Sequence, residues 1–114
     1  MTKPLLSFEK EIAARAREII LSDLSVYDTI PDLAIKVSTN PYTLQRVFKI
    51  AYGMSVPAFS RLVRIEEAKR LLQTTSDTLV TIGTIVGYAE GSVFQEAFKE
   101  VVGIPPGEWR RKPG

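Results

Sequence analysis

The sequence predicts an all-α fold of about seven helices, in which a long central helix joins two helix-turn-helix subdomains. Three observations support this fold class. Apolar residues recur at helical spacing along most of the chain, no segment alternates as a half-buried strand would, and the two halves match at an offset of 50 residues. The expected subdomains are residues 1–54 and 76–114, and residues 55–75 form the expected linker helix.

The first helix is expected over residues 7–24. Phe8, Ile12 and Ile20 recur at helical spacing and form its predicted apolar face, whereas Glu9 is counted among its polar positions. Such a pattern is typical of a surface helix that packs one face against a core.

Cap and stop signals place two further helices after it. Thr29 suits an N-cap, because its hydroxyl can accept from a free backbone N–H of the first turn. Asn40 is a second N-cap candidate, and Pro41 suits the first helical position, where an N–H has no helical partner. Gly53 is expected to end this helix, because glycine tolerates the positive φ of a C-terminal cap.

The second half repeats this order after a long helix. That helix is expected over residues 57–74, and a short helix that ends at Gly87 follows. Another helix is expected from Glu90 until Gly103 closes it, and a final turn holds Trp109. The succession of short helix, tight turn and second helix therefore occurs twice.

The match between the halves is strongest at the end of each unit. Phe48-Lys49 corresponds to Phe98-Lys99, Gly53 to Gly103, and Phe59 to Trp109. Similarity at a fixed offset indicates the same supersecondary unit built twice. Phe59 and Trp109 are expected to anchor the core of each unit rather than to stack on bases.

Each unit leaves a polar face of its second helix outside. These residues are Tyr42, Gln45, Arg46 and Lys49 in the first unit, and Ser92, Gln95, Glu96 and Lys99 in the second. Gln can pair with adenine and Arg with guanine through two hydrogen bonds, at about 1–3 kcal/mol of discrimination each. The first three residues of each set are therefore candidate base-reading residues. Lys49, Lys99 and Asn40 are candidate contacts to the DNA backbone.

A polar stripe on an amphipathic helix is also what a solvated surface looks like. The repetition favours double-stranded DNA as the partner, because two recognition helices about one DNA turn (~34 Å) apart can enter successive major grooves. Arg64, Lys69 and Arg70 on the linker helix are left with two readings, a solvated face or a contact to phosphate or a partner.

The composition excludes several classes of function. The 114 residues include no cysteine and no histidine, which excludes disulfides, thiolate metal sites, thiol nucleophiles and imidazole-based triads. Glu66 and Glu67 are adjacent on a helix and point about 100° apart, so they do not form an acid–base pair. We expect no enzyme, no cofactor, no metal and no small molecule bound by this segment.

The charge and hydropathy of the chain fit a cytoplasmic protein. The net charge of +2 is only weakly basic and by itself does not indicate nucleic acid. No apolar run approaches the roughly 18 residues of a membrane span, and the first residues do not form a secretory signal. We therefore expect a cytoplasmic location and no membrane partner.

A long, spaced signature extends over residues 30–111. It consists of Leu33-Ala34, Leu44 to Lys49, Gly53 and Arg64 to Leu72, then Ile82, Val86 to Tyr88, Ser92, Phe94, Phe98-Lys99, Gly103, Pro106, Glu108 and Arg110. With these residues the sequence resembles the AraC/XylS family of transcription regulators. The resemblance implies a two-lobed helical domain that binds promoter DNA as an activator or, less often, as a repressor. It puts base and nearby backbone contacts on the exposed residues of the two polar faces named above, and RNA polymerase is a further candidate partner.

Three departures from the family pattern concern the second unit. Glu96 stands where the family often has a basic or neutral residue, and its carboxylate repels phosphate although it can accept from cytosine. Ala89 occupies the expected capping position of its helix, and Gly83 costs a helix about 1 kcal/mol relative to alanine. These departures predict that the second unit binds DNA more weakly.

Two further questions remain open at this point. The chain is either a stand-alone regulator or the DNA-binding fragment of a longer, effector-responsive protein, and the resemblance favours the fragment. The alternative function is a degenerate helix-turn-helix domain that binds another protein, which the modest net charge and Glu96 would suit.

Overall fold

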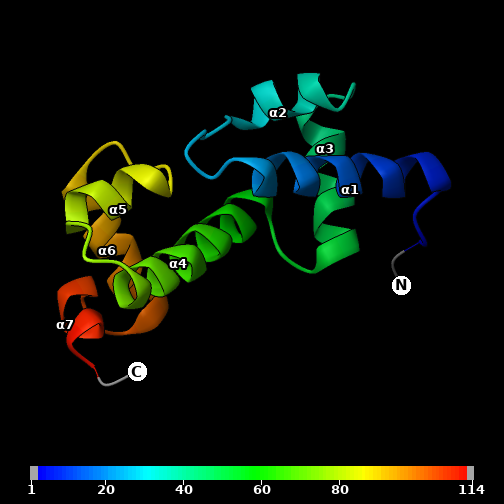
Figure 1. Ribbon diagram of the computed structural model, residues 1–114. Coiled ribbons are helices and arrows are strands. Elements are labelled where there is room, and N and C mark those ends of the chain that lie inside the picture. Colours follow the sequence, from blue (N-terminus) through cyan, green and yellow to red (C-terminus); the bar gives the residue numbers. More distant parts are fainter. Residues whose placement is uncertain (1–2, 113–114) are drawn as a thin grey trace. The chain divides into compact units, whose positions relative to one another are not determined.

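The computed structural model describes residues 3–112, and this part of the chain forms seven helices and no strand (Figure 1). The helices are α1 (Ser7–Ser22), α2 (Ile30–Lys36), α3 (Pro41–Tyr52), α4 (Val56–Thr74), α5 (Leu79–Ile85), α6 (Gly91–Val102) and α7 (Pro106–Arg111). The all-α fold class predicted from the sequence is confirmed. The first helix ends two residues before its expected end at residue 24.

The chain divides into two compact units, with the boundary between Ser60 and Arg61. This division differs from the three predicted segments, because the boundary falls inside α4 rather than at the ends of a separate linker over residues 55–75. α4 has 19 residues, which makes it about 28 Å long at ~1.5 Å per residue.

Both units use part of α4 in their cores. In the first unit, the ring of Phe59 lies 5.4 Å from that of Phe48 on α3. In the second unit, Ile65 and Leu72 are buried with residues of α5 and α6. α4 thus contributes apolar residues to the core of each unit.

In the first unit, α1, α2 and α3 pack against one another. Their buried apolar residues are Ala13, Ala16, Ile20, Leu33, Ala34, Val37, Leu44, Val47 and Phe48. Leu44, Val47 and Phe48 are completely buried, so one face of α3 is fixed against the core. The opposite face of α3 is thereby directed outward.

The apolar face predicted for α1 is wrong at its first turn. Phe8 is 58% exposed, whereas Glu9 is only 8% exposed. The buried residues of α1 are Glu9, Ala13, Ala16 and Ile20, which follow one another at helical spacing. Phe8 lies about 100° away from Glu9 around the helix, so it falls outside this stripe.

In the second unit, the end of α4 packs with α5, α6 and α7. The fully buried residues include Ile65, Ala68, Ile82, Val86, Phe94 and Phe98. Trp109 lies against Phe98, with 6.4 Å between the ring centroids, and its Nε1 donates to the carbonyl of Lys69 at 3.3 Å. The prediction that Trp109 and Phe59 anchor the core is confirmed.

Arg110 of α7 completes the second unit by capping the end of α4. Its Nε donates to the carbonyl of Leu72 at 3.0 Å, and its terminal nitrogen donates to the carbonyl of Thr75 at 3.3 Å. The last carbonyls of a helix have no partner within it, and a guanidinium is well suited to satisfy them. α7 is thereby tied to α4 by side chains as well as by apolar packing.

The predicted caps of the first unit are present. Thr29 Oγ1 accepts from the backbone N–H of Asp32 at 3.2 Å, and Asn40 Oδ1 accepts from that of Thr43 at 2.8 Å. Gly53 ends α3 with a φ of 76°. These contacts determine where α2 and α3 begin and where α3 ends.

The second helix-turn-helix turn is one residue longer than the first. Residues 37–40 connect α2 to α3, whereas residues 86–90 connect α5 to α6. Each turn includes one residue with positive φ, Ser38 at 59° and Gly87 at 96°. At the offset of 50 residues, α6 begins in register with α3, with Gly91 at the position of Pro41, and α5 lies one residue earlier than α2.

The bounds of α6 correct the capping position expected for this helix. The N-cap is Glu90 rather than Ala89, and the side chain of Glu90 makes no capping hydrogen bond. As expected, no side chain caps α6. The position without a cap is Glu90, which corresponds to Asn40 in the first unit. Gly83, which was predicted to weaken α5, has a packing reason, since a Cβ there would lie 3.1 Å from the ring of Phe94.

We predict that Glu90→Asn stabilises the second unit. The backbone of Glu90 has the extended conformation of an N-cap, and an asparagine there can accept from an N–H of the first turn, a contact usually worth about 0.5–2 kcal/mol. Urea unfolding followed by the fluorescence of Trp109, the single tryptophan, measures this change. The matched variant Asn40→Ala removes the cap of α3 and should lower the stability by about 1 kcal/mol. An unchanged or lower midpoint for Glu90→Asn would contradict the prediction.

Candidate nucleic-acid interface

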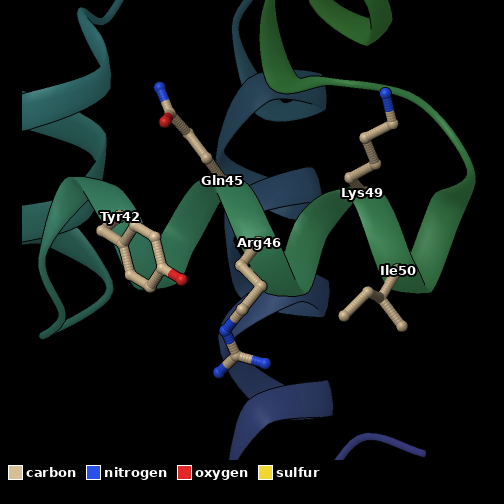
Figure 2. A pocket seen from close by; sticks show the side chains of 5 residues that line it. All are labelled: Tyr42, Gln45, Arg46, Lys49 and Ile50. Carbon is tan, nitrogen blue, oxygen red and sulfur yellow. The ribbon is translucent and has the colours of Figure 1, made fainter. Parts of the chain in front are cut away.

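The exposed face of α3 carries a continuous set of polar and apolar side chains. Tyr42, Gln45, Arg46, Lys49 and Ile50 line a surface pocket on this face (Figure 2). All five residues are exposed, and Tyr42 is 75% exposed. The structure thus brings together the four residues that helical spacing predicted and adds Ile50, one turn beyond Arg46.

Ile50 was missed because only polar positions were sought. It lies eight residues after Tyr42, and continuing the same helical spacing would have found it. An exposed isoleucine in this pocket provides the kind of apolar surface that can contact a thymine methyl group.

The side chains of this face extend in two directions. Figure 2 shows Gln45 and Lys49 on one side of α3, and Arg46 and Ile50 on the other. The side chain of Arg46 is 40% exposed, and its terminal nitrogen donates to Glu9 Oε2 on α1. Arg46 is therefore accessible, but its guanidinium is held by an ion pair within the first unit.

Glu9 is fixed in place by more than this ion pair. Its second oxygen, Oε1, accepts from the backbone N–H of Leu6 at 3.0 Å, at the start of α1. This hydrogen bond first, and the contact with Arg46 second, hold the pKa of Glu9 below its ordinary value of 4.5. The sequence offered no clear signal for this role, because Leu6 replaces the Ser or Thr that usually precedes a capping glutamate.

The second unit presents a matching but more acidic face on α6. Ser92, Gln95, Glu96 and Lys99 are all exposed, while Phe94 and Phe98 are buried beneath them. Glu100 follows on the same helix and pairs with Arg61 on α4 at 2.8 Å. The predicted positions are thus exposed in both units. α3 carries an arginine and a lysine and no acidic residue, whereas α6 carries one lysine and two glutamates.

Asn40 has a structural role at the start of α3. Its Oδ1 accepts from the N–H of Thr43, and its amide nitrogen is the side-chain group that can donate to a phosphate. The assignment of Asn40 to the DNA backbone therefore stays a prediction, as do the DNA contacts of the other exposed residues.

The three basic residues named on α4 differ in exposure. Arg64 is only 2% exposed, which contradicts the solvated face and leaves almost no surface for a contact to phosphate or a partner. Lys69 lies 3.3 Å from Glu66 and 5.0 Å from the ring of Trp109. Arg70 donates to both carboxylate oxygens of Glu67, at 2.6 and 2.9 Å. These glutamates stabilise the helix surface.

Within residues 3–112, no cluster of acidic, histidine or cysteine side chains could hold a metal ion. In the same part of the chain, no helix combines the length and the apolar character that crossing a membrane requires.

The fold and these faces define a helix-turn-helix protein, and residues 33–112 match the family described as helix-turn-helix domain. An AraC-like transcription regulator of Streptomyces lividans is 38% identical over 85 residues, which are 75% of this chain and 28% of that protein. The C-terminal domain of AraT, a response regulator from Geobacillus stearothermophilus, superimposes with a TM-score of 0.85 at 32% identity, over 88% of this chain and 84% of that one.

The DNA-binding domain of AdpA, a global transcriptional factor solved in complex with a target DNA, shares the fold with a TM-score of 0.82 at 20% identity. It covers 86% of this chain and 88% of that one. The chain belongs to the AraC/XylS family of DNA-binding transcription regulators. It spans well under half the length of the first curated relatives that it matches.

The charge difference between the two faces predicts unequal effects of substitution. Arg46→Ala should weaken binding to a specific duplex by about 1–3 kcal/mol, the discrimination of a bidentate arginine–guanine pair. Glu96→Ala removes a negative charge near phosphates and should leave the affinity unchanged or higher. Titration of both variants with the same duplex measures the two effects. Equal losses would contradict the predicted asymmetry.

The hydrogen bonds of Glu9 predict a dependence of stability on pH. Because the pKa of Glu9 is lowered by folding, its contribution is present above the unfolded value of about 4.5 and is lost as the pH falls through the folded value. Glu9→Gln removes this titration, so its free energy of unfolding should fall less on acidification than that of the unmodified chain. Urea unfolding over a series of acidic pH values tests this, with Glu11→Gln on the exposed face of α1 as the control. Parallel losses in both variants would show that Glu9 has no special role.

Proposed function

We propose that this chain is the sequence-specific DNA-binding part of a longer, effector-responsive transcription regulator, and that α3 and α6 enter successive major grooves of promoter DNA. The exposed face of α3 is the observation that carries this proposal. It combines Gln45 and Arg46, which can read base edges, with Lys49, which can neutralise a phosphate. The solved complex of the AdpA domain, which has the same fold, is bound to a target DNA.

Base reading is assigned to Tyr42, Gln45 and Arg46 in the first unit. Gln45 can donate to and accept from adenine at once, and Arg46 can donate twice to guanine. Tyr42 and Ile50 offer apolar surface beside them. Lys49 lies one turn after Gln45, where its ammonium can contact the backbone and fix the register of the helix.

The second unit is assigned a weaker share of the binding. Gln95 and Ser92 can contact base edges, and Lys99 can contact phosphate. Glu96 can accept from the amino group of cytosine, but it repels the backbone on either side of the groove. We therefore propose that α3 provides most of the specificity and that α6 mainly extends the site.

Further parts of the proposal concern partners and location. We propose that the chain acts on transcription in the cytoplasm, as an activator that contacts RNA polymerase from its DNA site, because its relatives are transcription regulators. The proposed activity is binding rather than catalysis. The alternative function, a protein-interaction module, is less well supported, because α3 keeps an accessible cationic face.

Selection of bound sites from a random duplex pool tests this function. The expected result is an enriched site with two recognised segments about one helical turn apart, the stronger of them contacted by the first unit. The affinity for that site should fall steeply with added salt, because phosphate contacts release counterions. A pool without enrichment, or an affinity that is insensitive to salt, would contradict the proposal and favour a protein partner.

Lys49→Ala provides a sharper test of the backbone contact. Removal of one phosphate contact should reduce the slope of log affinity against log salt by about 1, while the selected sequence stays the same. The control is Lys36→Ala, which removes the same charge from α2, where Lys36 pairs with Asp28 at 2.8 Å. An equal change of slope in both variants would indicate a general charge effect rather than a contact by Lys49.

A further inference from the structure

We propose that Glu9 is a specificity-determining residue that acts through Arg46: it holds this arginine away from the base-reading position in the free protein, and guanine must displace it. This inference rests on the proposed function, since it concerns how α3 reads DNA. Glu9 lies on α1, outside the helix-turn-helix unit formed by α2 and α3. The proposed control of base recognition thus comes from a residue outside the recognition helix α3.

Glu9 cannot follow Arg46 into a groove. Glu9 is 8% exposed, and its Oε1 is bound to the N–H of Leu6 at 3.0 Å. Its carboxylate is thus anchored at the start of α1, beside α3. Any movement of Arg46 towards DNA must break the bond between its terminal nitrogen and Glu9 Oε2.

The ion pair with Glu9 sets the direction of the Arg46 guanidinium. Figure 2 shows Arg46 extending on the side of α3 opposite to Gln45 and Lys49. A guanidinium has five N–H donors, so the ion pair leaves some of them free, but it determines where they point. Bidentate pairing with guanine needs two donors in the plane of the base edge, and the arginine must reorient to provide them.

Movement of Arg46 to DNA takes the cation away from the carboxylate of Glu9. A nearly buried carboxylate that loses its cation keeps only the hydrogen bond from the N–H of Leu6, and the lost ion pair opposes the release of Arg46. Guanine accepts two hydrogen bonds and can offset this penalty, whereas a base that offers no such pair cannot. The ion pair therefore adds a free-energy cost to the movement of Arg46 towards a base. Because guanine can offset this cost, binding becomes more selective for guanine.

The test is a double-substitution cycle on DNA binding. Glu9→Gln, Arg46→Ala and the double variant are titrated with the selected duplex and with a scrambled duplex of the same length. Glutamine keeps a carbonyl oxygen for the N–H of Leu6 but removes the charge that holds Arg46. We expect Glu9→Gln to bind the selected duplex about two- to fivefold more tightly, the range of a partly exposed ion pair. This gain should vanish in the Arg46→Ala background.

Two controls separate this effect from a general change of charge. Glu11→Gln removes an exposed carboxylate from the same helix and should change binding to both duplexes equally and slightly. Glu9→Asp keeps the charge but shortens the side chain, so it should also tighten binding to the selected duplex. Thermal unfolding of each variant without DNA verifies that it is folded, and Glu9→Asp replaces Glu9→Gln in the cycle if the latter is not.

Several outcomes would overturn the inference. Weaker binding by Glu9→Gln would show that the carboxylate supports Arg46 in its reading position. An equal gain on the scrambled duplex, or a gain that persists with Arg46→Ala, would show an ordinary charge effect. If the unmodified chain selects a site and Glu9→Gln binds it equally well, only this inference fails, whereas the absence of any selected site removes the proposed function as well.

Discussion

The structure depends on the burial of one face of α3. Leu44, Val47 and Phe48 are completely buried, and the latter two follow Leu44 at the i+3 and i+4 positions of one helix face, so the rotation of α3 about its axis is fixed. Turning the helix by a single residue would expose Phe48 and bury charged side chains, at a cost of several kcal/mol. The positions of Gln45, Arg46 and Lys49 on the outside follow from this packing, and their accessibility needs no separate explanation.

The same constraint explains how much could be predicted from the sequence. Helical periodicity and the internal repeat depend on local spacing and on side-chain size, and they were sufficient for the seven helices and for both exposed faces. The caps at Thr29 and Asn40 are equally local, because each side chain bonds to a backbone N–H three residues away. Features of this kind can be derived without knowing which helices touch.

Features that depend on contacts between helices were not predictable in this way. The ion pair between Glu9 and Arg46 joins residues 37 positions apart, and helical spacing alone placed Glu9 in solvent. Arg64 is buried for a similar reason, since its surroundings come from tertiary packing rather than from its own helix. In both cases a charged residue type suggested exposure, and the packing of neighbouring helices decided otherwise. The role of Glu9 in the proposed reading mechanism is accordingly a result of the three-dimensional arrangement.

The sharing of α4 between the two cores has a consequence for how the domain can be divided. The contact boundary between Ser60 and Arg61 lies in the middle of a continuous helix, so a cut at this point would create two new helix ends with unsatisfied backbone groups. The first unit would also keep only residues 56–60 of α4, and such a short helix is marginal in water. The two units are distinct in their contacts but share one continuous helix, so a shorter fragment that is meant to contain either of them should end outside α4 rather than at the contact boundary.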